Sequence, residues 1–236
     1  MFEHRRSGAE PGLTEDPRTQ DSPAVDEGTI AVTTLANRPR SDPRERLLDA
    51  MIGAVAERGY DRTTVSRLLS RADVPEAVFS EHFRDKHDCF MQAIDGVIGR
   101  VESSAIELFA QSRPWPERVS LALEWLLAAL ARHSDAADVV FVEMLGAGPA
   151  ACERHREALS LFASMLDEGR LLCTDSAHLP SQTSEAIVGG IASIVHRRAL
   201  QGKLAELPAL HADLTYFALL PYLDHERAVV VAGLKS

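Results

Sequence analysis

The sequence predicts an all-α protein in which a short three-helix, helix-turn-helix unit precedes a longer bundle of helices. From Ser41 onward, apolar residues recur at the spacing of amphipathic helices, and Pro or Gly stands at most of the breaks between them. No stretch between turn signals alternates apolar and polar residues as a half-buried strand would. The hydrophobic fraction of 45% allows a sizeable core.

Residues 1–40 differ from the rest of the chain in composition. They are rich in Pro, Gly, Ser, Thr and acidic residues and nearly lack aromatic ones. Such a segment buries too little apolar surface to offset the entropy lost on ordering, so we expect a disordered tail. The segment also lacks the apolar core of a secretion signal.

The first expected helix follows Ser41 and Asp42, which can cap it, with Pro43 in its first turn. Its apolar stripe ends at Gly59, a residue suited to a left-handed helix end. A second short helix starts at Thr63 or Thr64. A tight connection over residues 72–74 leads to a third helix that Pro75 opens, which completes the pattern of a helix-turn-helix.

The remainder of the chain predicts longer helices. The expected spans are 87–111, 117–133, 135–146, 150–172, 182–203 and 208–230. No apolar run is long enough to cross a bilayer. The cysteines, Cys89, Cys152 and Cys173, are odd in number and widely spaced, which argues against a disulfide framework and for a reducing compartment. We therefore expect a soluble cytoplasmic protein without membrane contact.

The net charge of -10 gives no bulk attraction to nucleic acid, but a local face can still be basic. Basic side chains do recur along the first three expected helices, although acidic residues are interleaved with them. These basic residues are Arg44, Arg46, Arg58, Arg62, Arg67, Arg71, Arg84 and Lys86. The charge pattern is therefore compatible with DNA binding and only weakly favours it.

Enzymatic function is a poor alternative on sequence grounds. The chain has no Gly-rich phosphate loop, no Gly-x-Ser-x-Gly, no His-Glu-x-x-His and no paired-cysteine metal motif. Cys152 and His155 stand one helical turn apart and could form half of a metal site, but a small thiol and a surface imidazole are the commoner outcome. We expect no catalytic residues, no metal and no cofactor.

Four segments together resemble the N-terminal domain of the TetR family of transcriptional regulators. They are RLLDAMIGAVAERGY (46–60), TTVSRLL (63–69), ADV (72–74) and HFRDK (82–86), in the order and spacing of the family. The resemblance implies an N-terminal DNA-binding domain over residues 41–86 and a helical ligand-binding and dimerisation domain over residues 87–232. It further implies a repressor that binds a palindromic operator as a homodimer and that a small molecule releases.

Within this framework, individual residues acquire expected roles on DNA. Thr63, Thr64 and the first amides of the second helix would hold a phosphate, since a helix N-terminus attracts anions. The third helix would enter the major groove, and basic side chains around it, including Arg67 and Arg84, would contact phosphates. The expected DNA contacts are Arg44, Arg62, Thr63, Thr64, Glu76, Ala77, Val78, Ser80, Glu81, His82 and Lys86.

The third helix departs from the family pattern. The turn Gly is replaced by Asp73 and the turn Ser by Pro75, and Ser80 replaces a tyrosine that family members use on DNA phosphates. Glu76 and Glu81 make this helix acidic. An acid near DNA either reads cytosine or repels the backbone. A TetR-like dimer that senses a ligand or partner without sequence-specific DNA binding therefore stays open as an alternative.

The C-terminal segments IVGGI (187–191), HRR (196–198) and LPYL (220–223) resemble the last two helices of TetR regulators, which form a four-helix dimer interface in that family. Packing inside the chain's own core is the alternative for the same apolar stripe. The expected dimerisation residues are Ile187, Gly190, Ile191, Ile194, Val195, Phe217 and Leu220.

A ligand site is expected between helices of the bundle. Aromatic and methionine side chains at helical spacing could line it, although such residues more often form plain core. Because few polar groups recur on those faces, the expected ligand is small and mostly apolar. The expected lining residues are Phe109, Trp125, Phe141, Met144, Phe162 and Met165.

Overall fold

The computed structural model describes residues 42–172 and 179–234, and the expected tail over residues 1–40 and Cys173 lie outside them. The described residues are helical and contain no strand, in agreement with the all-α prediction. The first part of the chain forms α1 (Pro43–Arg58), α2 (Val65–Ala72), α3 (Glu76–His82) and α4 (Lys86–Phe109).

The boundaries of α1 follow from its capping residues. The Asp42 carboxylate accepts a hydrogen bond from the backbone N–H of Arg44, and Pro43 occupies the first turn, where its missing N–H costs nothing. At the other end Gly59 takes a φ of +84°, a conformation that a side chain would disfavour. Both boundaries therefore lie where the sequence predicts them.

The turn between α2 and α3 keeps its shape although the family glycine is absent. Asp73 adopts the left-handed conformation with a φ of +51°, which aspartate tolerates better than most residues. The backbone N–H of Val74 then donates to the Leu69 carbonyl and closes the end of α2. Pro75 is the N-terminal cap of α3 and provides no side-chain hydrogen bond.

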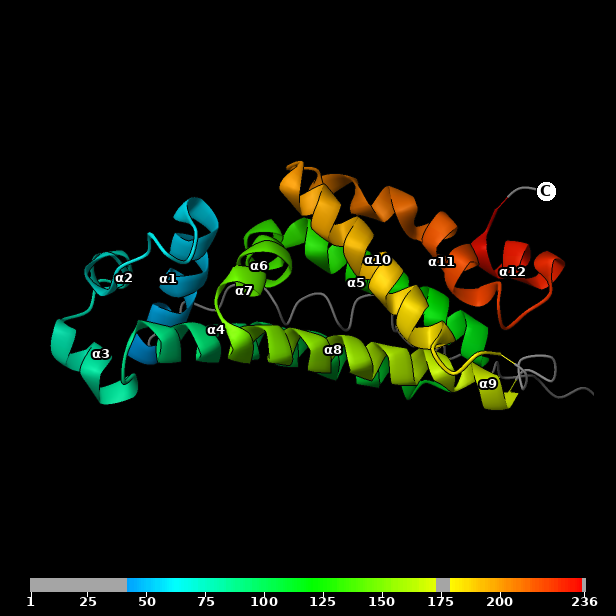
Figure 1. Cartoon of the computed structure of the whole chain (residues 1–236), viewed down its shortest axis with the longest axis horizontal. Helices are drawn as coiled ribbons and strands as arrows, with labels where there is room; N and C mark the ends of the chain where they lie inside the picture. Colours follow the sequence, from blue (N-terminus) through cyan, green and yellow to red (C-terminus); the bar gives the residue numbers. More distant parts are fainter. Residues whose placement is uncertain (1–41, 173–178, 235–236) are drawn as a thin grey trace, which may run out of the picture. The chain divides into compact units, whose positions relative to one another are not determined.

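The remaining helices form the larger part of the chain, and α4 and α8 run alongside one another beneath α5 and α10 (Figure 1). They are α5 (Trp115–Arg132), α6 (Ser134–Asp138), the π-helical turn η2 (Val139–Glu143), α7 (Met144–Gly146), α8 (Pro149–Asp167), α9 (Gly169–Leu172), α10 (Thr183–Leu200), the 3-10 turn η4 (Leu204–Leu210), α11 (His211–Leu219) and α12 (His225–Ala232).

The expected single helix over residues 208–230 is wrong, because it is divided into the end of η4, α11 and α12. Pro221 lacks the N–H that would continue α11 past Leu220. Asp224 then starts α12 by accepting a hydrogen bond from the backbone N–H of Arg227. The expected helix over 150–172 is likewise interrupted, with a turn at Glu168 between α8 and α9.

The largest apolar core joins the first three helices to the beginning of α4 and to the α6–α8 region. Its fully buried members include Leu47, Met51, Leu68 and Phe90 from the N-terminal helices, and Met144 from α7. The helix-turn-helix thus shares one core with part of the larger bundle. The α1 helix is therefore in direct packing contact with the region between α6 and α8.

Candidate functional site

The outer face of α3 is formed by short and acidic side chains. Phe79 of α3 and the following Phe83 are buried with their rings 5.4 Å apart, so the opposite face of the helix points away from the core. Exposed on that face are Glu76, Ala77, Ser80, Glu81 and His82. The Ser80 hydroxyl donates to the Glu76 carbonyl 3.3 Å away, within the helix itself.

Two residues expected on DNA have their polar groups engaged inside the fold. The Thr63 side chain is 1% exposed, and its hydroxyl donates to the carbonyls of Gly59 and Ala54 at 3.0 and 3.2 Å. The Lys86 ammonium donates to the Tyr60 carbonyl at 3.0 Å and lies 4.1 Å from the centre of the Tyr60 ring. Thr63 thus fastens the connection after α1 to α1 itself, and Lys86 fastens the start of α4 to the same connection, so that both polar groups are engaged within the chain.

Arg44 and Val78, which were also expected to contact DNA, make contacts within the fold. The Arg44 guanidinium donates to the Gln92 side chain at 2.6 Å and lies 5.9 Å from the centre of the Phe83 ring. Val78 is half-buried and packs against the first core. Neither side chain projects freely from the α3 face.

Basic groups do stand at the edges of the helix-turn-helix. Arg62 and the cap residue Thr64 are exposed, and Arg84 is 87% exposed beside Asp88. The Thr64 hydroxyl accepts from the backbone N–H of Arg67, which is the arrangement expected of an N-terminal cap. Positive charge therefore flanks α3 and is absent from it.

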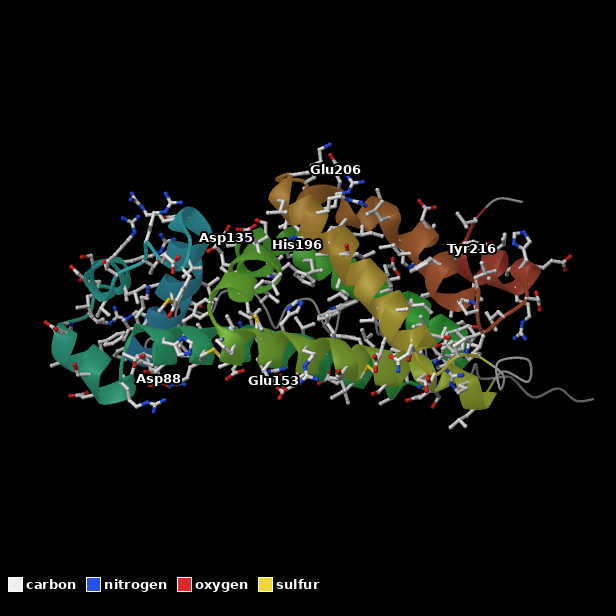
Figure 2. The ribbon with its side chains drawn as sticks, viewed as in Figure 1. Asp88, Asp135, Glu153, His196, Glu206 and Tyr216 are labelled. Atoms are coloured by element: carbon white, nitrogen blue, oxygen red, sulfur yellow. The ribbon has the colours of Figure 1, made fainter. Side chains whose placement is uncertain are left out.

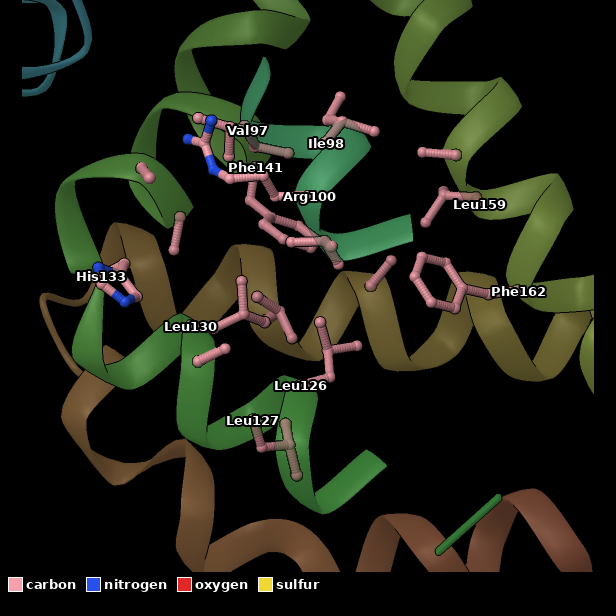
Figure 3. A pocket seen from close by; sticks show the side chains of 18 of the residues that line it. Val97, Ile98, Arg100, Leu126, Leu127, Leu130, His133, Phe141, Leu159 and Phe162 are labelled. Carbon is pink, nitrogen blue, oxygen red and sulfur yellow. The ribbon is translucent and has the colours of Figure 1, made fainter. Parts of the chain in front are cut away.

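A cavity of about 540 Å³ lies between the helices of the larger part of the chain, in the size range of small-molecule sites (Figure 3). Its walls come from α4, α5, α8 and α10, and from α1 and α2 at one end. Most of the wall is aliphatic or aromatic. Apolar lining residues are Val97, Ile98, Val101, Val119, Leu123, Leu126, Leu127, Leu130, Leu159, Leu166, Val188, Ile191 and Val195.

The residues expected to line a ligand site fall into two groups. Phe109, Phe141, Phe162 and Met165 are part of the wall. Trp125 and Met144 are not among the lining residues. Trp125 packs with the buried side chains of Leu108 and Ala129, and Met144 is fully buried in the first core. The sequence could not separate these groups, because both obey the same helical periodicity.

One end of the cavity is polar. Figure 3 shows Arg100 and His133 on the same side, away from Phe162. Burial, with the charges of Arg132 and Arg100, holds the pKa of His133 below its ordinary value. The other polar side chains lining the cavity include Asp49, Arg71, Arg132, Ser134, Asp135 and His155. Figure 2 labels Asp135 on α6, which packs against α1.

A smaller hollow of about 290 Å³ adjoins this polar end along α1 and α4. The two hollows share Asp49, Ile52, Val97 and Arg100. Sequence analysis missed this end of the site entirely. The available signal was Gly53, a buried glycine in the middle of a helix, since such a residue often marks a close approach of another group.

His155 belongs to the cavity wall and not to a metal site. Its ring packs edge-on against Phe141 at 5.7 Å, and burial, together with nearby His196, lowers its pKa. The Cys152 thiol donates instead to the Leu145 carbonyl at 3.3 Å. Within residues 42–172 and 179–234, no group of three or more His, Cys, Asp or Glu side chains could hold a metal ion.

The expected dimerisation stripe on α10 faces the chain's own interior. Ile187 and Val195 are 4% and 2% exposed, and Ile191 and Val195 line the cavity. Ile194 is half-buried and packs against a second buried cluster, which includes Leu127 of α5 and Leu207 of η4. Ile187 and Val195 therefore pack inside the chain, while Ile191 and Ile194 stay partly exposed, and the 3.6-residue period alone does not distinguish an internal face from an external one.

The exposed apolar surface nearby is formed by a neighbouring face of α10 and by α11. Gly190 faces Phe217, since a Cβ atom at Gly190 would lie 3.5 Å from the Phe217 ring. Phe217 and Leu220 are 45% and 40% exposed. These three expected residues therefore share one accessible patch, which we call the Phe217 patch.

Comparison with known proteins agrees with the helix-turn-helix. The family model described as "Bacterial regulatory proteins, tetR family" matches residues 47–93, which run from α1 into α4. The part of the chain that is similar to this family is therefore the helix-turn-helix with the first turns of α4. The proteins of this family are bacterial regulators, as its description states.

Solved structures resemble the fold of this chain over most of its length. The fatty acid degradation regulator FadR from Bacillus halodurans is 19% identical with a TM-score of 0.70, covering 78% of this chain and 97% of its own. FadR from Bacillus subtilis in complex with stearoyl-CoA is 19% identical with a TM-score of 0.65, covering 75% and 98%. The regulatory protein TetR from Rhodobacter sphaeroides is 25% identical with a TM-score of 0.58, covering 75% and 97%.

Among curated protein sequences, no relative matches the chain. No helix in the part of the chain that the structure describes is both long and apolar enough to cross a membrane.

Proposed function

We propose that this chain is a cytoplasmic TetR-family repressor that binds a palindromic operator as a homodimer and leaves it when an amphipathic ligand enters the cavity. The observation that carries the proposal is the cavity of about 540 Å³, because its wall joins the helical bundle to α1 and α2 of the helix-turn-helix. A ligand that fits only one spacing of these helices shifts the population toward that spacing.

For DNA, the proposal uses the exposed part of the expected contacts. The N-terminus of α2 at Thr64 would hold a phosphate, with Arg62 and Arg84 beside it. On α3, Ala77 would contact a thymine methyl group, and Glu76 or Glu81 would accept from a cytosine amino group. The acidic α3 lowers general affinity for DNA and favours selection of particular bases.

For the ligand, the apolar length of the cavity supports a molecule with an alkyl chain. Phe109, Phe141, Phe162 and Met165 would contact it. One structurally similar protein is a fatty acid degradation regulator by name, and another, a transcriptional regulator, was solved in complex with stearoyl-CoA. We therefore propose a fatty acid or its thioester as the ligand class.

For the homodimer, we propose the Phe217 patch as the centre of a two-fold interface. The Phe217 ring packs over Gly190 of its own chain, and Phe217 and Leu220 present apolar surface that a second copy would cover. The division into a DNA-binding domain over 41–86 and a ligand-binding and dimerisation domain over 87–232 is part of the same proposal.

The experiment that tests the proposed function begins with a random double-stranded DNA pool and the purified full chain. Bound sequences are selected, and binding of the enriched sequence is repeated across salt concentrations and in the presence of stearoyl-CoA. We expect an enriched palindrome, affinity that falls steeply with salt, and release by the ligand. Absence of any enriched sequence, from a sample shown to be a folded dimer, would contradict operator recognition.

A second candidate function has one specific observation in its favour. Glu76 and Glu81 are both exposed on α3, and the helix contains no lysine or arginine. These acids would repel DNA phosphates and fit a ligand-sensing dimer that acts through a protein partner. Replacing both by Gln separates the candidates, because a DNA reader loses base preference, whereas the sensor keeps ligand affinity and dimerisation.

A further inference from the structure

Arg71 connects the helix-turn-helix to the wall of the cavity. It belongs to α2, and its guanidinium occupies the place where a Cβ atom at Gly53 of α1 would stand. A Cβ atom at Gly53 would be 2.8 Å from the Arg71 Cζ atom, closer than two such atoms can approach. Gly53 therefore allows Arg71 to lie beside α1, which explains a glycine in the middle of a helix that otherwise favours alanine.

Arg71 lines the cavity and has N–H donors that its ion pair with Glu57 does not use. Its Nη1 atom bonds to the Glu57 carboxylate, which also accepts from Arg67 at 3.0 Å. A guanidinium carries five N–H donors, so the bond to Glu57 leaves others. The Arg71 side chain is 39% exposed, so that a bound group could reach it.

The charged residues of the cavity lining favour an anion. The whole lining contains Arg71, Arg100 and Arg132 against two carboxylates, Asp49 and Asp135. The Nε2 atom of His133, in the same wall, is buried without a hydrogen-bond partner in the described part of the chain. A group with several acceptor oxygens would satisfy both the guanidinium donors and the imidazole N–H.

We propose that the polar end of the cavity binds the anionic headgroup of the ligand, and that Arg71 carries this contact directly to α2. The inference rests on the proposed function and adds the charge of the headgroup and the residue that senses it. A ligand with its alkyl chain among the aromatic side chains and its headgroup on Arg71 would span the bundle and the helix-turn-helix. The position of α2 then depends on whether the headgroup is present.

Three probes with the same alkyl chain test the headgroup: dodecanoate, dodecanol and dodecylammonium, all below their aggregation concentrations. Their binding to the full chain is measured by calorimetry. We expect dodecanoate to bind about 10-fold more tightly than dodecanol, as a charge-assisted hydrogen bond predicts, and dodecylammonium to bind most weakly. Equal affinity for the three probes would overturn the proposal.

Variants assign the effect to Arg71. Arg71→Gln is expected to weaken dodecanoate binding about 10-fold and to leave dodecanol unchanged. Arg67→Gln is the matched control, because Arg67 shares the Glu57 carboxylate but does not line the cavity, and it should leave both affinities unchanged. Gly53→Ala, which displaces Arg71 without removing it, should weaken dodecanoate binding selectively as well.

The remaining outcomes are also decisive. Equal weakening of dodecanoate and dodecanol by Arg71→Gln would overturn the proposal, since it would show a general change in the cavity. If none of the probes binds, both the inference and the fatty acid part of the proposed function fail. Headgroup discrimination in a chain that selects no DNA would overturn operator recognition and leave the assignment to Arg71 standing.

Discussion

The helix-turn-helix and the cavity are two regions of one fold that differ in how their residues come together. In the first, neighbouring helices close a packed core in which Leu47, Leu68 and Phe90 are fully buried. In the second, distant helices leave a space of about 540 Å³ unfilled. The first region is therefore tightly packed into one fixed shape, whereas the second is less tightly packed and has room to bind a ligand.

The same substitution in the two regions should have very different costs. Phe90→Ala removes a ring that is 0% exposed and lies 4.6 Å from the Tyr60 ring, so we expect a loss of about 3–5 kcal/mol in the free energy of unfolding. Phe162→Ala removes a ring that already borders empty space, and we expect about 1 kcal/mol. Denaturant unfolding of both variants measures the difference. Equal costs would mean that the cavity wall is packed as tightly as the core.

The junction between the two regions should be the next most sensitive point. The Glu143 carboxylate, at the end of η2, accepts from the backbone N–H of Tyr60 at 2.8 Å, just after α1. Glu143→Ala leaves this donor unpaired, and we expect a loss of about 1–2 kcal/mol, with about half of it restored in Glu143→Gln. Thermal unfolding provides the measurement. Unchanged stability in Glu143→Ala would show that the bond does not join the regions.

Neighbouring threonines allow a sharper test within the helix-turn-helix. Thr64→Ala removes the cap of α2 and Thr63→Val removes a buried hydrogen bond, so each should cost about 1 kcal/mol in stability. On the selected DNA, however, only Thr64→Ala should weaken binding, because the Thr63 hydroxyl is inside the fold. An equal loss of affinity in both variants would contradict this assignment.

The cavity region should also give the molecule a mild dependence on pH. Burial first, and then the nearby His196, lower the pKa of His155 from its ordinary 6.5. Below about pH 6.5 the unfolded chain therefore binds more protons than the folded one, and stability falls as the pH drops toward the folded pKa. His155→Gln removes this contribution, so its unfolding free energy should fall less steeply with acid. A profile as steep as that of the unaltered chain would contradict the assignment to His155.

The sequence predicted the helix-turn-helix well because its signals are local. Asp42, Pro43 and Gly59 mark the ends of α1 through capping and backbone preference, and these depend on adjacent residues alone. What local signals could not show is the direction of individual polar groups. Thr63 and Lys86 carry plausible DNA-binding side chains, yet both bond to carbonyls that the fold brings to them.

The cavity was predictable only as a class of site. Phe109 and Phe162 come from helices far apart in the sequence, and periodicity does not tell a wall residue from a core residue such as Trp125. The polar end was missed because the Arg71 guanidinium lies beside α1 at Gly53, in the place that a Cβ atom there would take. Such a contact depends on tertiary structure and leaves almost no trace in the sequence.

The central claim is that the cavity and the DNA-binding surface are coupled, and one measurement tests it most directly. The affinity of the full chain for its selected DNA is measured with and without saturating stearoyl-CoA, and the affinity for stearoyl-CoA is measured with and without that DNA. The account predicts that both affinities fall by the same factor, on the order of 5–150-fold, because coupling between two sites is reciprocal. Affinities that do not change in either direction would contradict the account.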